Sequence, residues 1–122
     1  MTMPDRSVCR EGAWTRAMLN LGGFVGPKGF DAAAFAHAAR LATIALDIAL
    51  AIVAQPTPRL ARRCWDFRPI GLGVTNLGGA LMAQAIPYDS DAGRGFCAAA
   101  CALMTGTAYA TSAEMAAELG AF

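Results

Sequence analysis

The sequence predicts a mainly α-helical chain, and three observations favour that fold class. Three stretches lie between a residue that commonly caps a helix and a proline or glycine that stops one; they span residues 32–55, 58–67 and 91–119. Much of the 56% hydrophobic fraction is alanine, the residue with the highest helix propensity. In the first stretch the larger apolar residues also recur at helical spacing.

The first helix should begin after Asp31, whose side chain can accept a hydrogen bond from a free backbone N–H of the first turn. Phe30 and Phe35 have the spacing of a hydrophobic staple. The helix should end near Gln55, because Pro56 cannot continue it. It carries two apolar stripes, so we expect neighbours on two sides; the stripes are Leu41, Ile44, Ile48 and Ile52, and Leu46, Leu50 and Val53.

The remaining elements are placed by glycine, proline and capping residues. Residues 17–29 should form a short extended piece followed by a loop. Thr57 and Pro58 should start a short basic helix that ends near Phe67. Glycines should make the backbone turn or approach a neighbour closely at Gly71, Gly73, Gly78 and Gly79.

Two further helices should follow this glycine-rich segment. One should start near Thr75 and end before Pro87. The last and longest should be capped by Asp89 or Ser90, have Asp91 near its positive end, and run to about Leu119, before Gly120. Residues 1–16 show no clear period, and no internal repeat or linker is evident.

Composition argues against several classes of partner. Ten basic and nine acidic residues give a net charge of +1, so we expect neither nucleic acid nor an anionic membrane surface as a partner. The N-terminus lacks the apolar core of a signal peptide. The apolar stretch from Leu41 to Ala54 is shorter than the roughly 20 residues that span a bilayer, and it contains Asp47. We expect a cytoplasmic protein with four reduced cysteines.

Two patterns suggest a binding site but have simpler explanations. A dinucleotide-binding fingerprint after Gly71 and Gly73 would need a third glycine where Asn76 stands. Cys97 and Cys101 lie four residues apart on the last helix, so their thiols share one side. They could hold part of a metal or redox site, but the apolar residues around them favour small buried core residues.

Charged residues on the helices also fall short of a catalytic site. His37 and Arg40 should mark a polar edge of the first helix, and Asp47, two turns from Arg40, could pair with it indirectly. Glu114 and Glu118 should form a solvated face, because a carboxylate metal site in a bundle would need Glu-x-x-His. The residues by themselves name no reaction and no metal site.

Several segments, in order, resemble the large catalytic chain of class II ribonucleotide reductases, which depend on adenosylcobalamin. Residues 35–41 look like the family's Phe-x-His-Ala-x-Arg-Leu helix. Residues 68–79 resemble its Arg-Pro-(Ile/Leu)-Gly-Leu-Gly-x-x-Asn-Leu-Gly-Gly segment. Residues 87–91 and 109–115 match the family's text almost letter for letter, and the similarity runs from about Ala17 to the end.

The resemblance implies a piece of a ten-stranded α/β barrel that surrounds a finger loop with a radical cysteine. In that family adenosylcobalamin supplies the radical, and ribonucleotides are reduced to deoxyribonucleotides for DNA synthesis. The matching segments fall on helices that flank the barrel, together with their connections. The implied role is therefore to position and protect the reactive centre.

The sequence departs from the family pattern at the positions of the catalytic residues. The Asn-x-Cys-x-Glu loop of the radical cysteine does not occur in this sequence. Residues 17–21 resemble the second half of a strand whose cysteine belongs to the reducing pair, but in that register Trp14 occupies the cysteine position. Cys9 would fit only with an insertion. We therefore assign no catalytic residue, no metal ligand and no cofactor-binding residue.

These observations lead to one main hypothesis and two alternatives. Residues 1–16 are unassigned, and residues 17–122 form part of a reductase barrel domain that is inactive alone and binds no cofactor alone. Its partners would be the remainder of the reductase chain or a second copy, with ribonucleotide bound only in the complete enzyme. The alternatives are a non-catalytic helical remnant that acts as an interaction module or oligomer, and a small membrane-associated protein.

Overall fold

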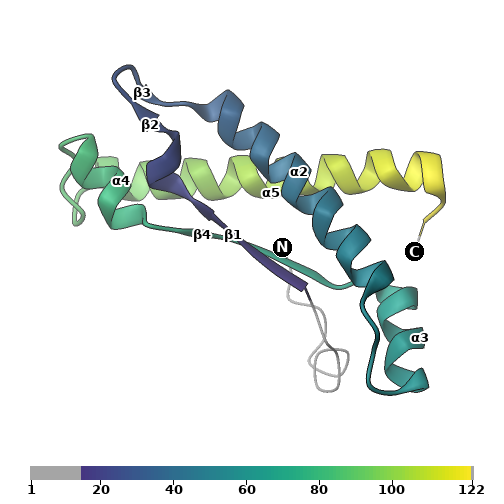
Figure 1. The fold of residues 1–122 in the computed structure, drawn as a ribbon. Coiled ribbons are helices and arrows are strands. Elements are labelled where there is room, and N and C mark those ends of the chain that lie inside the picture. The colour runs from purple at the N-terminus through teal and green to yellow at the C-terminus, as the bar shows by residue number, and fades with distance from the viewer. Residues whose placement is uncertain (1–14, 122) are drawn as a thin grey trace.

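The computed structural model describes residues 15–121, and helices dominate it, as the sequence predicts (Figure 1). In chain order the elements are β1 (Thr15–Asn20), the 3-10 turn η1 (Leu21–Phe24), β2 (Val25–Gly26), β3 (Gly29–Phe30), α2 (Ala32–Ile52), α3 (Pro58–Phe67), β4 (Ile70–Thr75), α4 (Leu77–Ala83) and α5 (Asp91–Leu119). The extended piece and the loop expected over residues 17–29 correspond to β1, η1 and the small β2–β3 hairpin.

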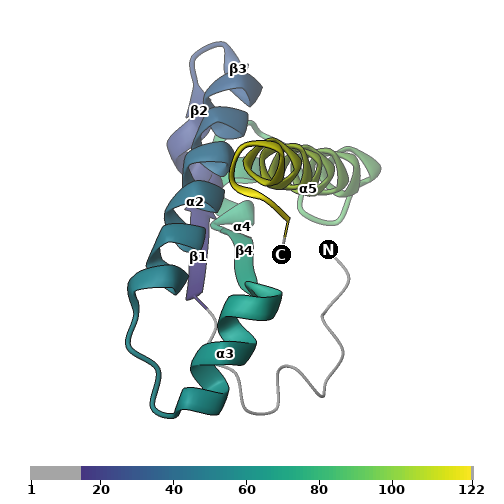
Figure 2. The ribbon, with the colours of Figure 1, turned by 90° about the vertical axis from the view of Figure 1, so that its right-hand side faces the viewer.

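Two parallel strands form the centre of the described chain. β1 and β4 pair in register from Thr15 opposite Ile70 to Asn20 opposite Thr75. α2 runs along this strand pair and contacts both strands. It also packs against α5, which it crosses (Figures 1 and 2). Along β1 the residues alternate between half-buried and exposed, so Ala17 and Leu19 pack on the core while Met18 points outward. One face of the strand pair is therefore covered and the other is open among residues 15–121.

The helix ends follow the capping residues closely. The Asp31 side chain accepts a hydrogen bond from the Ala34 N–H at 2.9 Å. Thr57 caps α3, which has Pro58 as its first residue. Ser90 caps α5 by accepting a bond from the Gly93 N–H at 3.0 Å.

The far ends of these helices also agree with the sequence. α3 ends at Phe67 and α5 at Leu119, as predicted, and Gly120 follows α5 with a positive φ of 91°. α2 ends at Ile52, slightly before the predicted Gln55. Local signals therefore place every helix to within a few residues.

An aromatic cluster covers one end of the core. The rings of Phe30 and Phe35 lie 5.3 Å apart, which confirms the predicted staple. Phe24 lies 5.3 Å from Phe35, and Phe96 of α5 lies 5.1 Å from Phe30. The cluster joins the β2–β3 hairpin, α2 and α5.

The glycine-rich segment is a strand rather than a turn, which corrects the sequence analysis. Gly71 and Gly73 lie inside β4, and α4 begins at Leu77 rather than near Thr75. The close approach expected of these glycines is present: a Cβ on Gly73 would lie 2.8 Å from the sulfur of Met18. Isolated glycines weaken the strand signal, and pairing with the distant β1 overrides it.

Only one of the two apolar stripes of α2 is covered. Leu46 and Leu50 are buried against the strands and α3. Leu41, Ile48 and Ile52 are 53%, 54% and 78% exposed. The expectation of neighbours on both sides is therefore not met within residues 15–121.

By length and composition alone, α2 could cross a membrane. The sequence instead predicts that the apolar stretch from Leu41 to Ala54 is too short to do so. A third of the most apolar window of α2 is buried inside the described structure, and one such helix is weak evidence because a core helix of a soluble protein passes the same test. Its Asp47 is also held by an arginine. A membrane span is therefore weakly supported.

Candidate functional site

One groove of the described chain is lined by β4 and by the C-terminal half of α5. It has a volume of about 700 Å³, and Ile70 and Leu72 of β4 form one wall. The C-terminal half of α5 forms the other wall, with Tyr109 and Met115. Among residues 15–121, β4 pairs only with β1, so its second edge is unpaired there. The groove is an apolar trough lined by a strand with an unpaired edge, which suits a further stretch of polypeptide.

An ion pair between Arg68 and Asp47 lines part of the groove. The Arg68 guanidinium donates two hydrogen bonds to the Asp47 carboxylate, from Nε to Oδ1 and from Nη2 to Oδ2, each at 2.6 Å. The side chains are only 23% and 15% exposed, and the guanidinium also lies 5.3 Å from the Trp65 ring. A two-pronged contact of this kind holds the α3–β4 connection against α2.

This geometry corrects the predicted pairing of Asp47 with Arg40. Arg68 ends α3 in the left-handed conformation, with φ of 42°, and so turns its side chain toward α2. Arg40 instead forms an ion pair with Glu114 of α5, and both side chains are about half exposed. Glu114 therefore contributes to helix packing as well as to the solvated face. His37 is exposed, as predicted for the polar edge of the helix.

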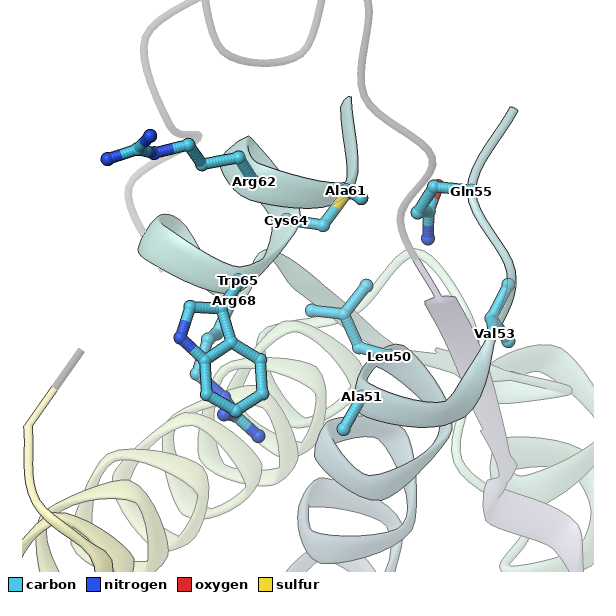
Figure 3. A pocket seen from close by; sticks show the side chains of 9 residues that line it. All are labelled: Leu50, Ala51, Val53, Gln55, Ala61, Arg62, Cys64, Trp65 and Arg68. Carbon is cyan, nitrogen blue, oxygen red and sulfur yellow. The ribbon is translucent and has the colours of Figure 1, made fainter. Parts of the chain in front are cut away.

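A smaller pocket, of about 350 Å³, lies on the other side of Arg68 (Figure 3). Leu50, Cys64, Trp65 and Arg68 line it, and Arg62 points away from the others. Gln55 also lines it, and both polar atoms of its amide are buried without a hydrogen-bond partner. In the sequence Gln55 is recognisable only as the end of the first helix, and no local pattern marks it as a buried amide.

The carboxyl ends of the two strands are tied together by asparagines. Asn20 Oδ1 accepts hydrogen bonds from the Gly22 N–H at 3.1 Å and from Asn76 Nδ2 at 2.9 Å. Cβ atoms on Gly22 and Gly79 would lie 2.5 and 2.2 Å from the Asn76 amide, so side chains at those positions would displace it. Only small residues fit around this junction.

The junction also contains a short repeat, contrary to the expectation that the sequence has none. Asn-Leu-Gly-Gly occurs at residues 20–23 and again at 76–79, each time where a parallel strand passes into a helical turn. A search for four-residue matches would have found it. Because both copies lie side by side, the repeat marks equivalent ends of two strand–helix units.

Cys97 and Cys101 share one side of α5, as predicted, but they are half-buried rather than buried. They lie beside the buried face formed by Ala100 and Met104 instead of on it. Burial raises the pKa of the Cys101 thiol, and the charge and hydrogen bond of Cys97 raise this pKa further.

The donor atoms do not assemble into a metal or cofactor centre in the described part of the chain. No three His, Cys, Asp or Glu side chains come together between residues 15 and 121. Cys64 is buried near α2, away from the Cys97–Cys101 pair, and the predictions for Cys9 and Trp14 lie outside the described residues. The described residues instead form ion pairs and amide hydrogen bonds that hold helices and strands against one another.

Comparison with known proteins gives a consistent result. The family model for the ribonucleotide reductase barrel domain matches residues 9–122. A vitamin B12-dependent ribonucleotide reductase of Agrobacterium fabrum is 48% identical over 95 residues, and those of Bradyrhizobium diazoefficiens and Rhodopirellula baltica are 46% and 45% identical over 98 and 107 residues. These alignments cover 78%, 80% and 87% of this chain but only 8%, 8% and 10% of the three relatives.

Proposed function

Because this chain belongs to the barrel-domain family of ribonucleotide reductases, we propose that it forms part of the supporting shell of an adenosylcobalamin-dependent reductase. The parent reaction would be the reduction of ribonucleotides to deoxyribonucleotides by a cysteine-radical mechanism. The chain would contribute strands β1 and β4 and the helices packed on them. It would be inactive without the remainder of the enzyme.

The open strand pair is the observation that carries this proposal. Parallel sheets occur almost only with both faces covered, and two parallel strands make a poor independent unit. Here Met18 is exposed on the uncovered face, the second edge of β4 is unpaired among residues 15–121, and Ile70 and Leu72 of β4 line an apolar groove. The remainder of the reductase chain is the partner that would cover both.

If the complete enzyme forms a ten-stranded barrel, as the family resemblance implies, a further barrel strand would occupy the groove. Gly120 and Ala121, which follow α5, line the groove beside β4. Polypeptide continuing from this point would need no long connection to lie along the free edge of β4. Successive strand–helix units in a parallel sheet join in this way. We place the next barrel strand there.

His37, the chain's one histidine, lies on an exposed part of α2. Adenosylcobalamin and ribonucleotide would be bound in the complete enzyme. The cytoplasmic location stays a prediction from the sequence.

Complementation tests the proposal. Two polypeptides would supply the parts of the Agrobacterium relative before and after the aligned segment, with adenosylcobalamin and a dithiol reductant. Adding this chain should produce deoxyribonucleotide, and omitting it should not. If the relative's own segment restores reduction in this assay and this chain never does, the proposal fails.

A matched pair of variants locates the contact. Ala116 lines the groove, whereas Ala113 lies on the exposed side of the same helix. Ala116→Lys should abolish complementation, because it places a charge in the apolar groove. Ala113→Lys should leave complementation unchanged.

Self-association is the second kind of partner that the sequence predicts. It would use apolar surface that the described chain leaves open, above all the uncovered side of α2.

A further inference from the structure

The uncovered side of α2 carries a regular apolar pattern. Apolar residues alternate at spacings of four and three; in order they are Ala34, Ala38, Leu41, Ala45, Ile48 and Ile52. Ala38 is half-buried and the others are exposed. Figure 2 shows α2 at the margin of the molecule, with β4 and α5 on its other side. We call these residues the outer seam, and their spacing is that of the contact positions of a coiled coil.

The outer seam is free of charge. The charged residues of α2 are Arg40 and Asp47, and both are held on other sides of the helix, by Glu114 and Arg68. His37 is the nearest ionisable group on the same helix. Because nothing on the seam offers a partner for a charged surface, its occupant must itself be uncharged there. A helix with the same apolar spacing meets that condition.

The sizes of the seam residues favour a second copy of the same helix. In an antiparallel pair centred near Thr43, Ala34 would meet Ile52 of the second copy, and Ala38 would meet Ile48. Leu41 would meet Ala45 in the central layers. Every layer then contains one alanine and one larger side chain, which is the alternation that fills a helix interface evenly.

A parallel pair would pack poorly. Ala34 and Ala38 would then face themselves and leave gaps, while Ile48 and Ile52 would crowd the other end. The antiparallel arrangement also sets the positive end of each helix dipole beside the negative end of the other. A twofold axis generates it, as in most homodimers.

We propose that α2 of this chain docks antiparallel against α2 of a second copy through the outer seam. The seam is about 27 Å long on a helix about 10 Å wide, so the buried area is small, as in weak and transient interfaces. The dimer should therefore be weak. This inference needs only the described chain and does not depend on the reductase assignment.

Sedimentation of the whole chain over a concentration range of about a hundredfold tests the proposal. We expect a reversible monomer–dimer equilibrium. Ala38→Glu or Ile48→Lys alone should weaken dimerisation about tenfold or more, because each buries a charge opposite an apolar residue. Met82→Lys is the control, since Met82 is 77% exposed on α4, outside the seam, and should leave the equilibrium unchanged.

The double variant Ala38→Glu, Ile48→Lys tests the direction of pairing. In the antiparallel dimer each glutamate meets a lysine of the second copy, so dimerisation should recover to within about threefold of the original chain. In a parallel dimer like charges would meet, and the double variant would stay monomeric. Circular dichroism checks that each variant keeps its helices, and Ala45→Glu replaces any variant that does not.

Three results would overturn the proposal. The chain could remain monomeric throughout the concentration range, Met82→Lys could abolish the dimer, or the double variant could fail to recover. A monomer that floats with neutral phosphatidylcholine vesicles would assign the seam to lipid. A monomer that binds the separate reductase pieces through the seam, with binding lost in Ile48→Lys, would assign it to the longer chain.

Discussion

Arg68 connects three parts of the molecule through one side chain: it ends α3, stacks near Trp65 and holds Asp47 of α2. Arg68→Ala should lower the free energy of unfolding by about 2 kcal/mol, because it leaves a mostly buried carboxylate without its donors. Arg68→Lys should restore only part of this, since an ammonium cannot make the two-pronged contact. Urea unfolding monitored by circular dichroism measures both.

Arg94→Ala is the control for this prediction. Arg94 also contacts two carboxylates, those of Asp89 and Asp91, but all three side chains are mostly exposed. Exposed pairs contribute little, so the free energy of unfolding should stay close to that of the original chain. Equal losses in the two variants would contradict the importance given to the Arg68–Asp47 pair.

Cys101 should make stability fall at alkaline pH. Its pKa is raised in the folded chain, so the folded state keeps the thiol proton while the unfolded state loses it. Stability is therefore complete below the unfolded pKa of about 8.5 and declines as pH rises through the folded pKa. Cys101→Ser should reduce this decline, measured as the difference in urea unfolding free energy between neutral and alkaline buffer. An unchanged decline would show that Cys101 does not contribute.

At the scale of elements, the Asn-Leu-Gly-Gly repeat fixes where β1 and β4 end. Gly79→Ala should cost about 1–2 kcal/mol, because the new Cβ would displace the Asn76 amide from Asn20. Gly78→Ala, next to it, has open space and should gain up to about 1 kcal/mol from helix propensity. Thermal unfolding of the two variants provides the comparison.

A double variant separates this clash from other effects. Asn76→Gly removes the amide and tolerates the left-handed φ of 59°. In that background Gly79→Ala should cost nothing further. A cost that persists without Asn76 would mean that another neighbour resists the new methyl group.

At the scale of the molecule, the described chain leaves a large apolar surface exposed. Large apolar side chains stay exposed on β1, α2 and α5, including Met18, Ile52 and Leu119. We expect the isolated chain to keep its helices but to unfold in a broad transition, with a melting temperature that rises with concentration as copies associate. Calorimetry tests this, and a sharp transition independent of concentration would contradict it.

Much of the fold could be predicted from the sequence, while the contacts of the candidate site could not. Asp31, Thr57 and Ser90 cap helices as expected, and the family resemblance is confirmed by the match over residues 9–122. The half-burial of Cys97 and Cys101 and the buried amide of Gln55 depend on what surrounds them. No pattern along the chain carries that information.

The sequence by itself determined the helices, their ends and the family, because capping, proline and helix propensity act within a few residues. Only the tertiary structure decided that residues 70–75 form a strand and that Asp47 pairs with Arg68 rather than Arg40. Both outcomes require segments far apart in the chain to meet. Their free energy comes from pairing and burial between those segments, which short-range patterns do not record.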